Sequence, residues 1–297
     1  MKCDLCPRKC LVDRKKGEKG ICGQTENLKV ARAALHFWEE PCISGDAGSG
    51  AVFFSGCPLH CVFCQNENIA NGTVGKEISL ERLVDIFLEL QEKGANNINL
   101  VTPGHFVPQI VKALDQARME GLTLPVVYNT SSYETVDTIK MLEGYVDIYL
   151  PDFKYMSPVL SKKYSHAPDY AEVAKAAIAE MVRQTGKAVF VNGDEDNLIL
   201  SGTIVRHLTL PGCMADSMQI LKYLHETYGD TIYISIMNQF TPLSNLEKYP
   251  ELNRKITDEE YEALVDYAIE IGIENGFIQE GDTAEESFIP AFDCEGV

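Results

Sequence analysis

The sequence predicts an α/β protein built on an open, partial (β/α)6 barrel with a small cysteine-rich metal-binding segment at its N-terminus. Short apolar runs alternate with longer stretches whose apolar residues recur at helical spacing. This alternation is typical of parallel strands joined by helices that cover the outer face of a sheet. We count about six such units, two fewer than a closed eight-stranded barrel needs.

Each expected strand is a short apolar run bounded by glycine, proline or polar residues, which favours strand over helix. The barrel strands expected on this basis are 51–54, 97–102, 124–129, 146–150, 204–210 and 232–237. Two further runs, 188–191 and 198–200, are separated by Asn192-Gly193-Asp194 and predict an inserted hairpin.

The first long helix illustrates the helical signals. Ser79 is a suitable N-cap, apolar residues from Leu80 to Leu90 recur on one face, and Gly94 ends the pattern. The other expected helices are 107–119, 133–142, 171–184, 215–228 and 258–274.

The chain divides into four expected parts. Residues 1–24 form the metal-binding segment, 25–50 connect it to the barrel, 51–280 form the barrel, and 281–297 are a tail. Residues 280–286 are acidic, and we expect them to be solvated.

Charge and composition exclude some function classes. The chain has 26 basic and 44 acidic side chains, a net charge of −18, which disfavours binding to a phosphate backbone. It has no apolar run long enough to span a membrane, and its first residues lack a signal-peptide core, so we expect a cytoplasmic location. In such a reducing compartment, the ten cysteines are expected to bind metal or act in catalysis.

Three cysteines directly follow the first barrel strand. Cys57, Cys61 and Cys64 have the spacing C-x3-C-x2-C, which lets one tight loop reach three corners of an iron–sulfur cubane. Three protein ligands leave the fourth iron open for chemistry, by the logic that separates catalytic from structural zinc sites. The alternatives are a zinc knuckle, for which His60 is badly placed as a fourth ligand, or buried free thiols.

This motif resembles the signature of the radical S-adenosylmethionine (SAM) superfamily, C-x3-C-x-aromatic-C, with Phe63 in the aromatic position. The stretch from Gly45 to Asn66 looks like the opening of glycyl-radical-enzyme activases such as pyruvate formate-lyase activating enzyme, and of their uncharacterised relatives. The resemblance implies that the open iron of a [4Fe–4S] cluster binds SAM. Reductive cleavage then yields a 5′-deoxyadenosyl radical that abstracts hydrogen from a substrate.

The resemblance also implies roles for polar residues at the expected strand ends, where sites in such folds gather. Asp152 and Lys154 match the Asp-x-Lys of activases, and Arg206 resembles an arginine that contacts the methionine carboxylate. A charge in an apolar strand is costly unless it is paired, so the alternative for Arg206 is a buried ion pair. An exposed Asp–Lys pair would be only a weak salt bridge.

The remaining cofactor-binding candidates lie at other strand ends. Activases carry Gly-Gly-Glu after their second strand, whereas this chain has Thr102-Pro103-Gly104-His105, so Thr102 or a backbone carbonyl would replace the carboxylate. His105 is either functional or an ordinary loop histidine. The resemblance implies a shared role for Asn129 and Thr130, and Asn238 and Gln239 could face substrate.

Four further cysteines, Cys3, Cys6, Cys10 and Cys22, form a complete ligand set within the first 22 residues. They would bind either structural zinc or a second [4Fe–4S] cluster; the alternative is an extended arm used by a partner. The basic residues between 8 and 19 are interpreted as a solvated loop around this site.

These observations leave three alternative functions. The chain is a radical enzyme that acts on a protein glycine, a radical enzyme that acts on a peptide or small molecule, or a non-catalytic iron–sulfur or zinc protein. The polar strand ends argue against the last function. The missing Gly-Gly-Glu and the added N-terminal cysteines weaken the activase assignment. The resemblance implies a low-potential flavodoxin or ferredoxin as electron donor, oxygen sensitivity and an anaerobic host.

Overall fold

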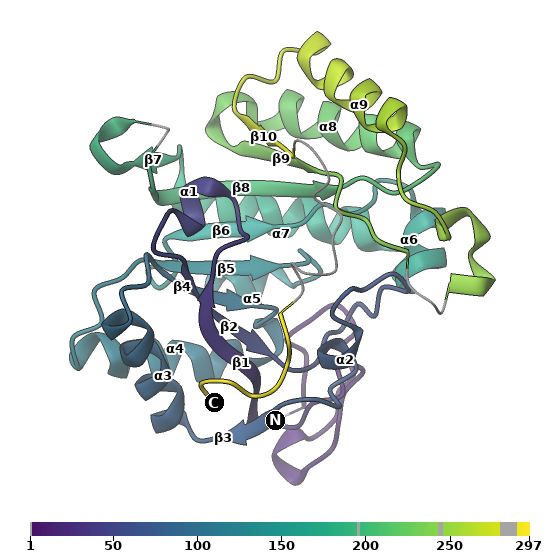
Figure 1. The fold of residues 1–297 in the computed structure, drawn as a ribbon. Coiled ribbons are helices and arrows are strands. Elements are labelled where there is room, and N and C mark those ends of the chain that lie inside the picture. The colour runs from purple at the N-terminus through teal and green to yellow at the C-terminus, as the bar shows by residue number, and fades with distance from the viewer. Residues whose placement is uncertain (1, 195–196, 243–245, 280–289) are drawn as a thin grey trace.

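The computed structural model describes residues 2–194, 197–242, 246–279 and 290–297, and its centre is one strongly curved sheet with the order β10-β9-β8-β6-β5-β4-β2-β1-β3 and with β7 paired to β8 (Figure 1). The strands are β1 (Leu28–His36), β2 (Ser49–Phe54), β3 (Lys76–Ile78), β4 (Ile98–Val101), β5 (Val126–Thr130), β6 (Ile148–Pro151), β7 (Val189–Phe190), β8 (Ile199–Leu208), β9 (Tyr233–Met237) and β10 (Gly276–Ile278).

Parallel pairing dominates the sheet. From β2 through β4, β5, β6, β8 and β9 to β10, every neighbouring pair is parallel, whereas β1 is antiparallel to both β2 and β3. Within the described ranges, the edge strands β10 and β3 do not pair with each other. The sheet is therefore an unclosed, partial barrel, as the sequence predicted.

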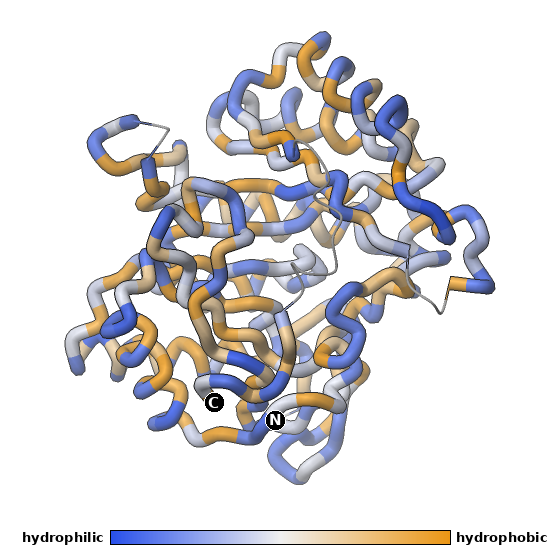
Figure 2. The backbone as a smooth tube through the Cα atoms, in the orientation of Figure 1, coloured by the Kyte–Doolittle hydropathy of each residue, from blue (hydrophilic) through white to orange (hydrophobic). Residues whose placement is uncertain are grey.

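The longer helices, among them α3, α4, α7 and α8, follow parallel strands and cover the outer face of the sheet, and apolar segments concentrate on the strands (Figures 1 and 2). The helices are α1 (Pro41–Ser44), α2 (Glu67–Ala70), α3 (Leu80–Glu92), α4 (Val107–Met119), α5 (Val136–Lys140), α6 (Pro158–Ser165), α7 (Tyr170–Thr185), α8 (Met214–Tyr228) and α9 (Asp258–Glu270). In the described part of the chain, none of these helices is both long and apolar enough to cross a bilayer.

Most expected elements are present, with α3 capped by the Ser79 hydroxyl as predicted. Three expectations were wrong in detail. The runs 198–200 and 204–210 belong to one strand, β8, because the polar residues between them continue the extended backbone. The helix expected over 133–142 shortens to α5, and the one expected over 258–274 ends at Glu270. The acidic residues 280–286 lie outside the described residues.

The strand β10 was not predicted, because its three residues are too few to show a periodic pattern. It extends the parallel sheet beyond the expected six strands.

The barrel interior changes from apolar to polar along the strands. Ile43 of α1 packs against Val127 and Ile204 near the amino ends of the strands. Side chains alternate between the two faces of a strand, so Asn129 and Arg206, two positions further on, face the same interior. The apolar floor thus supports a polar layer at the carboxyl ends.

The segment 25–50 contributes β1 and α1, and the last residues of the chain pack against β1. The backbone N–H of Ala33 donates to the Glu295 carbonyl at 2.8 Å, and the N–H of Cys294 donates to the Ala31 carbonyl at 3.0 Å. Arg32 forms ion pairs with Asp293 and Glu295 at 3.2 and 2.5 Å. Both segments are thus integral to the packed structure.

The core under the loop that follows β2 gives a stability prediction. Phe54 is fully buried and lies 6.0 Å from Phe106 between ring centroids. Phe54→Ala should lower the free energy of unfolding by about 3 to 5 kcal/mol, because it leaves a cavity. The control Met119→Ala, at a side chain that is 81% exposed, should change it by less than about 0.5 kcal/mol. Urea denaturation measures both; equal effects would contradict the placement of Phe54.

Candidate functional site

A cavity of about 250 Å³ opens at the carboxyl ends of the strands. It brings together candidates from the ends of β4, β5, β6, β8 and β9 and from the loop after β2, although they are far apart in the sequence. The predicted residues that line it are Cys57, Cys61, Phe63, Cys64, Thr102, Asn129, Thr130, Asp152, Lys154, Arg206 and Gln239.

The cysteine loop starts directly after β2 and turns sharply back on itself. The backbone N–H of Cys64 donates to the Cys61 carbonyl at 3.1 Å, which closes a tight turn between two of the thiols. Two hydrogen-bond donors point at sulfur atoms. The Ser165 hydroxyl lies 3.1 Å from Cys61 Sγ, and the Leu59 N–H lies 3.5 Å from Cys57 Sγ.

The donor set of this loop fits an iron–sulfur cluster. Burial raises the pKa of all three thiols, that of Cys64 to about 12, so three thiolates need a compensating positive charge to share the cavity. The irons of a cluster supply this charge, and hydrogen bonds to sulfur are typical of such sites. Across the described ranges, no three His, Cys, Asp or Glu side chains converge as ligands of one ion. Cluster ligands bind separate irons and need no such convergence.

Phe63 anchors the loop to the barrel. Its ring is buried, with centroid distances of 6.0 Å to Phe240 and 6.4 Å to Tyr155. Edge-to-face packing of this kind holds the loop on the rim of the cavity.

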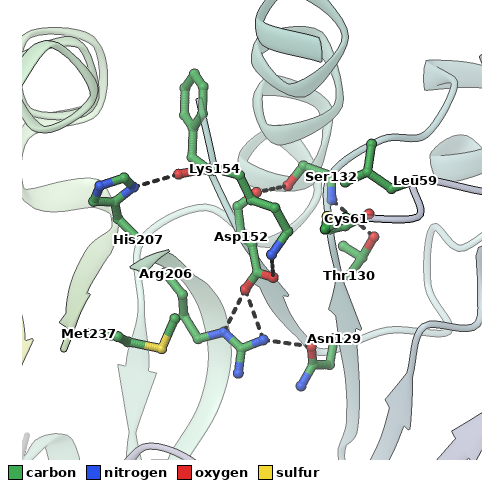
Figure 3. Close-up of polar contacts among 12 residues, drawn as sticks. Leu59, Cys61, Asn129, Thr130, Ser132, Asp152, Lys154, Arg206, His207 and Met237 are labelled. Atoms are coloured by element: carbon green, nitrogen blue, oxygen red, sulfur yellow. Dashed lines mark hydrogen bonds and ion pairs between the residues drawn. The ribbon is translucent and has the colours of Figure 1, made fainter. Parts of the chain in front are cut away.

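A largely buried network of charges lines the same cavity and joins three strands (Figure 3). Asp152 lies between two cations: Lys154 Nζ is 2.6 Å and Arg206 Nε is 2.9 Å from its carboxylate oxygens. Arg206 also donates to Asn129 Oδ1 at 2.7 Å and to Glu39 Oε2 at 2.9 Å. The network links β5, β6 and β8 to the segment that precedes α1.

Mutual pairing keeps these groups charged. Burial alone would raise the pKa of Asp152, but Arg206 and Lys154 outweigh it and hold this pKa below its usual value. Burial alone would lower the pKa of Lys154 and Arg206, but nearby carboxylates raise both values. An isolated charge at this depth would be strongly disfavoured, so each group depends on the others.

Glu39 is the residue of this network that the sequence analysis missed. Besides Arg206, it accepts hydrogen bonds from the side-chain amides of Asn99 and Asn129 at 3.0 and 3.1 Å. It lies outside the strand ends, in a segment expected only to connect, so no local pattern marked it. Trp38 and His36 also line the cavity from this side.

Thr102 lines the cavity with an unusual backbone conformation. Its φ of 56° lies in the left-handed region, which a β-branched residue rarely adopts. Its N–H donates to the Asn129 carbonyl at 2.9 Å, which fixes the turn at the end of β4. Strain of this kind is typical of functional sites.

Three candidates lie outside the cavity lining: Gly104, His105 and Asn238. His105 is buried and donates from Nε2 to the Ser55 carbonyl at 2.8 Å, while its own carbonyl accepts from Arg14 at 2.6 Å. Burial lowers its pKa to about 3, so the ring is neutral. Gly104 packs on Glu134, whose carboxylate carbon would lie 2.8 Å from an added Cβ.

The N-terminal cysteines occupy a compact loop structure beside α2 (Figure 1). Cys22 is buried, and Cys3, Cys6 and Cys10 are partly exposed. The loop packs against the cysteine loop that follows β2, rather than standing apart from the barrel.

The family model for the radical SAM superfamily matches residues 51–199, about half of the chain, and this span includes the cysteine loop. The chain belongs to the radical SAM superfamily. Membership implies a [4Fe–4S] cluster and SAM as cosubstrate.

Other proteins share part of the sequence or the fold. The uncharacterized protein MJ0674 of Methanocaldococcus jannaschii is 26% identical over 276 residues, covering 90% of this chain and 74% of that protein. SuiB of Streptococcus suis bound to S-adenosylmethionine superposes with a TM-score of 0.52 at 14% identity, over 76% of this chain and 49% of SuiB. HydG, a maturase of the [FeFe]-hydrogenase, gives 0.51 at 15% identity, over 78% of this chain and 52% of HydG. The chain spans about half the length of these two structures, which share its fold.

The charge network gives a pH-dependent prediction. Arg206→Gln removes the main cation beside Asp152 and should destabilise the protein by about 3 to 5 kcal/mol at neutral pH. In the folded variant the pKa of Asp152 rises, because burial is no longer offset by Arg206. Asp152 therefore becomes protonated as the pH falls, and the cost of its unpaired charge disappears. The difference in unfolding free energy between the variant and wild type should therefore become smaller from pH 8 to pH 5.

The measurement is chemical denaturation at several pH values. Lys163→Gln, which removes an exposed ion pair to Glu251, is the control and should show a small deficit that does not depend on Asp152. A pH-independent deficit in Arg206→Gln would contradict the network.

Proposed function

We propose that this radical SAM enzyme holds its [4Fe–4S] cluster on Cys57, Cys61 and Cys64 and abstracts hydrogen from a polypeptide substrate. One observation carries the first part: three thiols and a largely buried network of paired charges line a single cavity. The bound cluster supplies the electron that cleaves SAM into methionine and a 5′-deoxyadenosyl radical.

The chain's own residues would hold SAM beside the cluster. Lys154 uses one of its three donors on Asp152 and keeps donors for the methionine carboxylate. Arg206 already donates hydrogen bonds to Asp152, Glu39 and Asn129, so its role would be to hold these three side chains in position. Thr102 and Asn129 both line the cavity, and the Thr102 backbone carbonyl would accept a hydrogen bond from the amino group. The buried ring of Phe63 would help to exclude water from the part of the cavity next to the cysteine loop.

The rim of the cavity supports a polypeptide substrate. Trp38 lines the cavity with 62% of its surface exposed, and its neighbour Phe37 is 49% exposed. An aromatic side chain in the wall of the cavity gives apolar contact to a substrate that enters it. A protein glycine, as in activases, and a peptide are the two forms of this substrate.

The cluster assignment predicts a clear assay result. Anaerobically reconstituted wild type, reduced with dithionite, should convert SAM to 5′-deoxyadenosine and methionine. Cys57→Ala/Cys61→Ala/Cys64→Ala should lose this activity, because no other described thiol lines the cavity. Cys213→Ala, outside the cavity, should retain it. Activity in the triple variant would disprove the assignment.

The substrate assignment is tested by isotope transfer. Extracts of host cells grown on deuterated amino acids are separated into a protein and peptide fraction and a small-molecule fraction. Each is added to the reduced enzyme with SAM, and deuterium in 5′-deoxyadenosine is measured by mass spectrometry. Transfer from the polypeptide fraction alone is expected; transfer from the small-molecule fraction alone would overturn the proposal. Trp38→Ala should reduce the transfer and leave the slow cleavage of SAM without substrate intact.

A further inference from the structure

We propose that Cys3, Cys6, Cys10 and Cys22 bind a second [4Fe–4S] cluster, and that electrons enter the enzyme through it from an acidic one-electron carrier protein. The inference rests on the proposed function, since the electron is delivered to the cluster of the Cys57 loop.

The four N-terminal thiols surround one small space. The backbone N–H of Cys3 donates to the Val12 carbonyl at 2.9 Å, which folds the segment into a closed loop. Cys10 Sγ and Cys22 Sγ lie 3.3 and 3.8 Å from the position of a Cβ on Gly20, so glycine keeps this space clear. The Cys6 thiol interacts electrostatically with the other three.

The surroundings of these thiols favour an iron–sulfur cluster over zinc. The Ile21 N–H donates to Cys10 Sγ at 3.2 Å, and Arg14 Nη1 lies 4.0 Å from Cys3 Sγ. Such donors stabilise a cluster when it gains an electron. Zinc would need all four thiolates at about 2.3 Å from one ion. The thiolates of a cubane bind four separate irons.

The N-terminal loop is packed directly against the Cys57 loop. The Cys22 carbonyl lies 2.5 Å from the position of a Cβ on Gly56, the neighbour of Cys57, so only glycine permits this approach. His60 Nε2 donates to the Ile21 carbonyl at 2.8 Å. Arg8 donates to the Pro58 carbonyl at 2.9 Å. The two sets of cysteines are therefore joined by a short path through bonded and packed atoms.

The outer side of the N-terminal loop is suited to an acidic partner. Residues 1–24 have seven basic and three acidic side chains, a net charge of +4, so the rest of the chain carries −22. Two side chains next to cysteines, Leu11 and Ile21, are 52% and 50% exposed. The same segment carries four exposed lysines: Lys9, Lys15, Lys16 and Lys19. An apolar centre within a charged rim is typical of a transient interface, and the charge steers an acidic partner to it.

The electron balance is simple. The reduced carrier loses one electron to the N-terminal cluster, and that cluster is reoxidised when it reduces the cluster of the Cys57 loop by one electron. Because the two cysteine loops are in contact and the basic residues lie on the N-terminal one, an acidic carrier would be attracted to this loop and repelled by the acidic remainder of the chain.

The first test is metal content. Wild type, Cys57→Ala/Cys61→Ala/Cys64→Ala and Cys6→Ser/Cys10→Ser are reconstituted anaerobically, and iron, sulfide and zinc are counted. We expect about eight irons in wild type and about four in each variant, with Mössbauer spectra of [4Fe–4S] clusters. Zinc in the triple variant, or about four irons in wild type, would overturn the proposal.

The second test is the rate of reduction. Stopped-flow absorbance follows cluster reduction by reduced flavodoxin, by reduced ferredoxin and by dithionite. Lys15→Glu/Lys16→Glu keeps all cysteines and should slow reduction by the carriers about tenfold at low salt, with dithionite reduction unchanged. Lys187→Glu/Lys222→Glu, an exposed pair elsewhere, is the matched control and should behave as wild type.

The outcomes separate this inference from the proposed function. Dithionite bypasses the carrier, so SAM cleavage with dithionite tests the Cys57 loop alone. Equal reduction by carriers in wild type and in both lysine variants would overturn electron entry at this surface, even where SAM cleavage is intact. If Cys6→Ser/Cys10→Ser does not fold, the lysine variants still test electron entry at this surface, because they keep all the cysteines.

Discussion

The ion pair between Arg206 and Asp152 is the contact on which the site depends. It crosses from β8 to β6 at the level where the barrel interior changes from apolar to polar. Arg206 reaches Asn129 on β5 and Glu39 before α1, so one guanidinium ties together four segments of the chain. Its planar fork of donors suits this task, which a lysine at the same position would not perform.

The network also offsets negative charge in the cavity. The cavity collects three thiols and two carboxylates in a protein whose net charge is −18. Arg206 and Lys154 are the cations placed among them, and burial makes each pairing strong. A bound cluster and the zwitterionic end of SAM would complete the balance of charge.

Close backbone approach is the second constraint. Gly56, with φ of 94°, lets the chain turn out of β2 and lets Cys22 pack against it. Gly56 therefore matters to both cysteine loops, because it precedes Cys57 in the chain and leaves room for the Cys22 carbonyl. The basic N-terminal segment is held against the Cys57 loop by contacts of Arg8 and His60 with backbone carbonyls, so the two cysteine loops pack directly against each other.

The sequence alone determined the fold class and the family, because both depend on local patterns. The three cysteines of the superfamily motif lie within eight residues of one another, and polar residues such as Asn129, Asp152 and Lys154 mark the ends of two strands. Only the tertiary structure decided which distant residues complete the site. Glu39 joins Arg206 across 167 positions, and His105 turns inward to Ser55 although its loop sits at a strand end. The strand β10 and the contact of Cys22 with Gly56 depend on long-range packing, which no period or spacing in the sequence encodes.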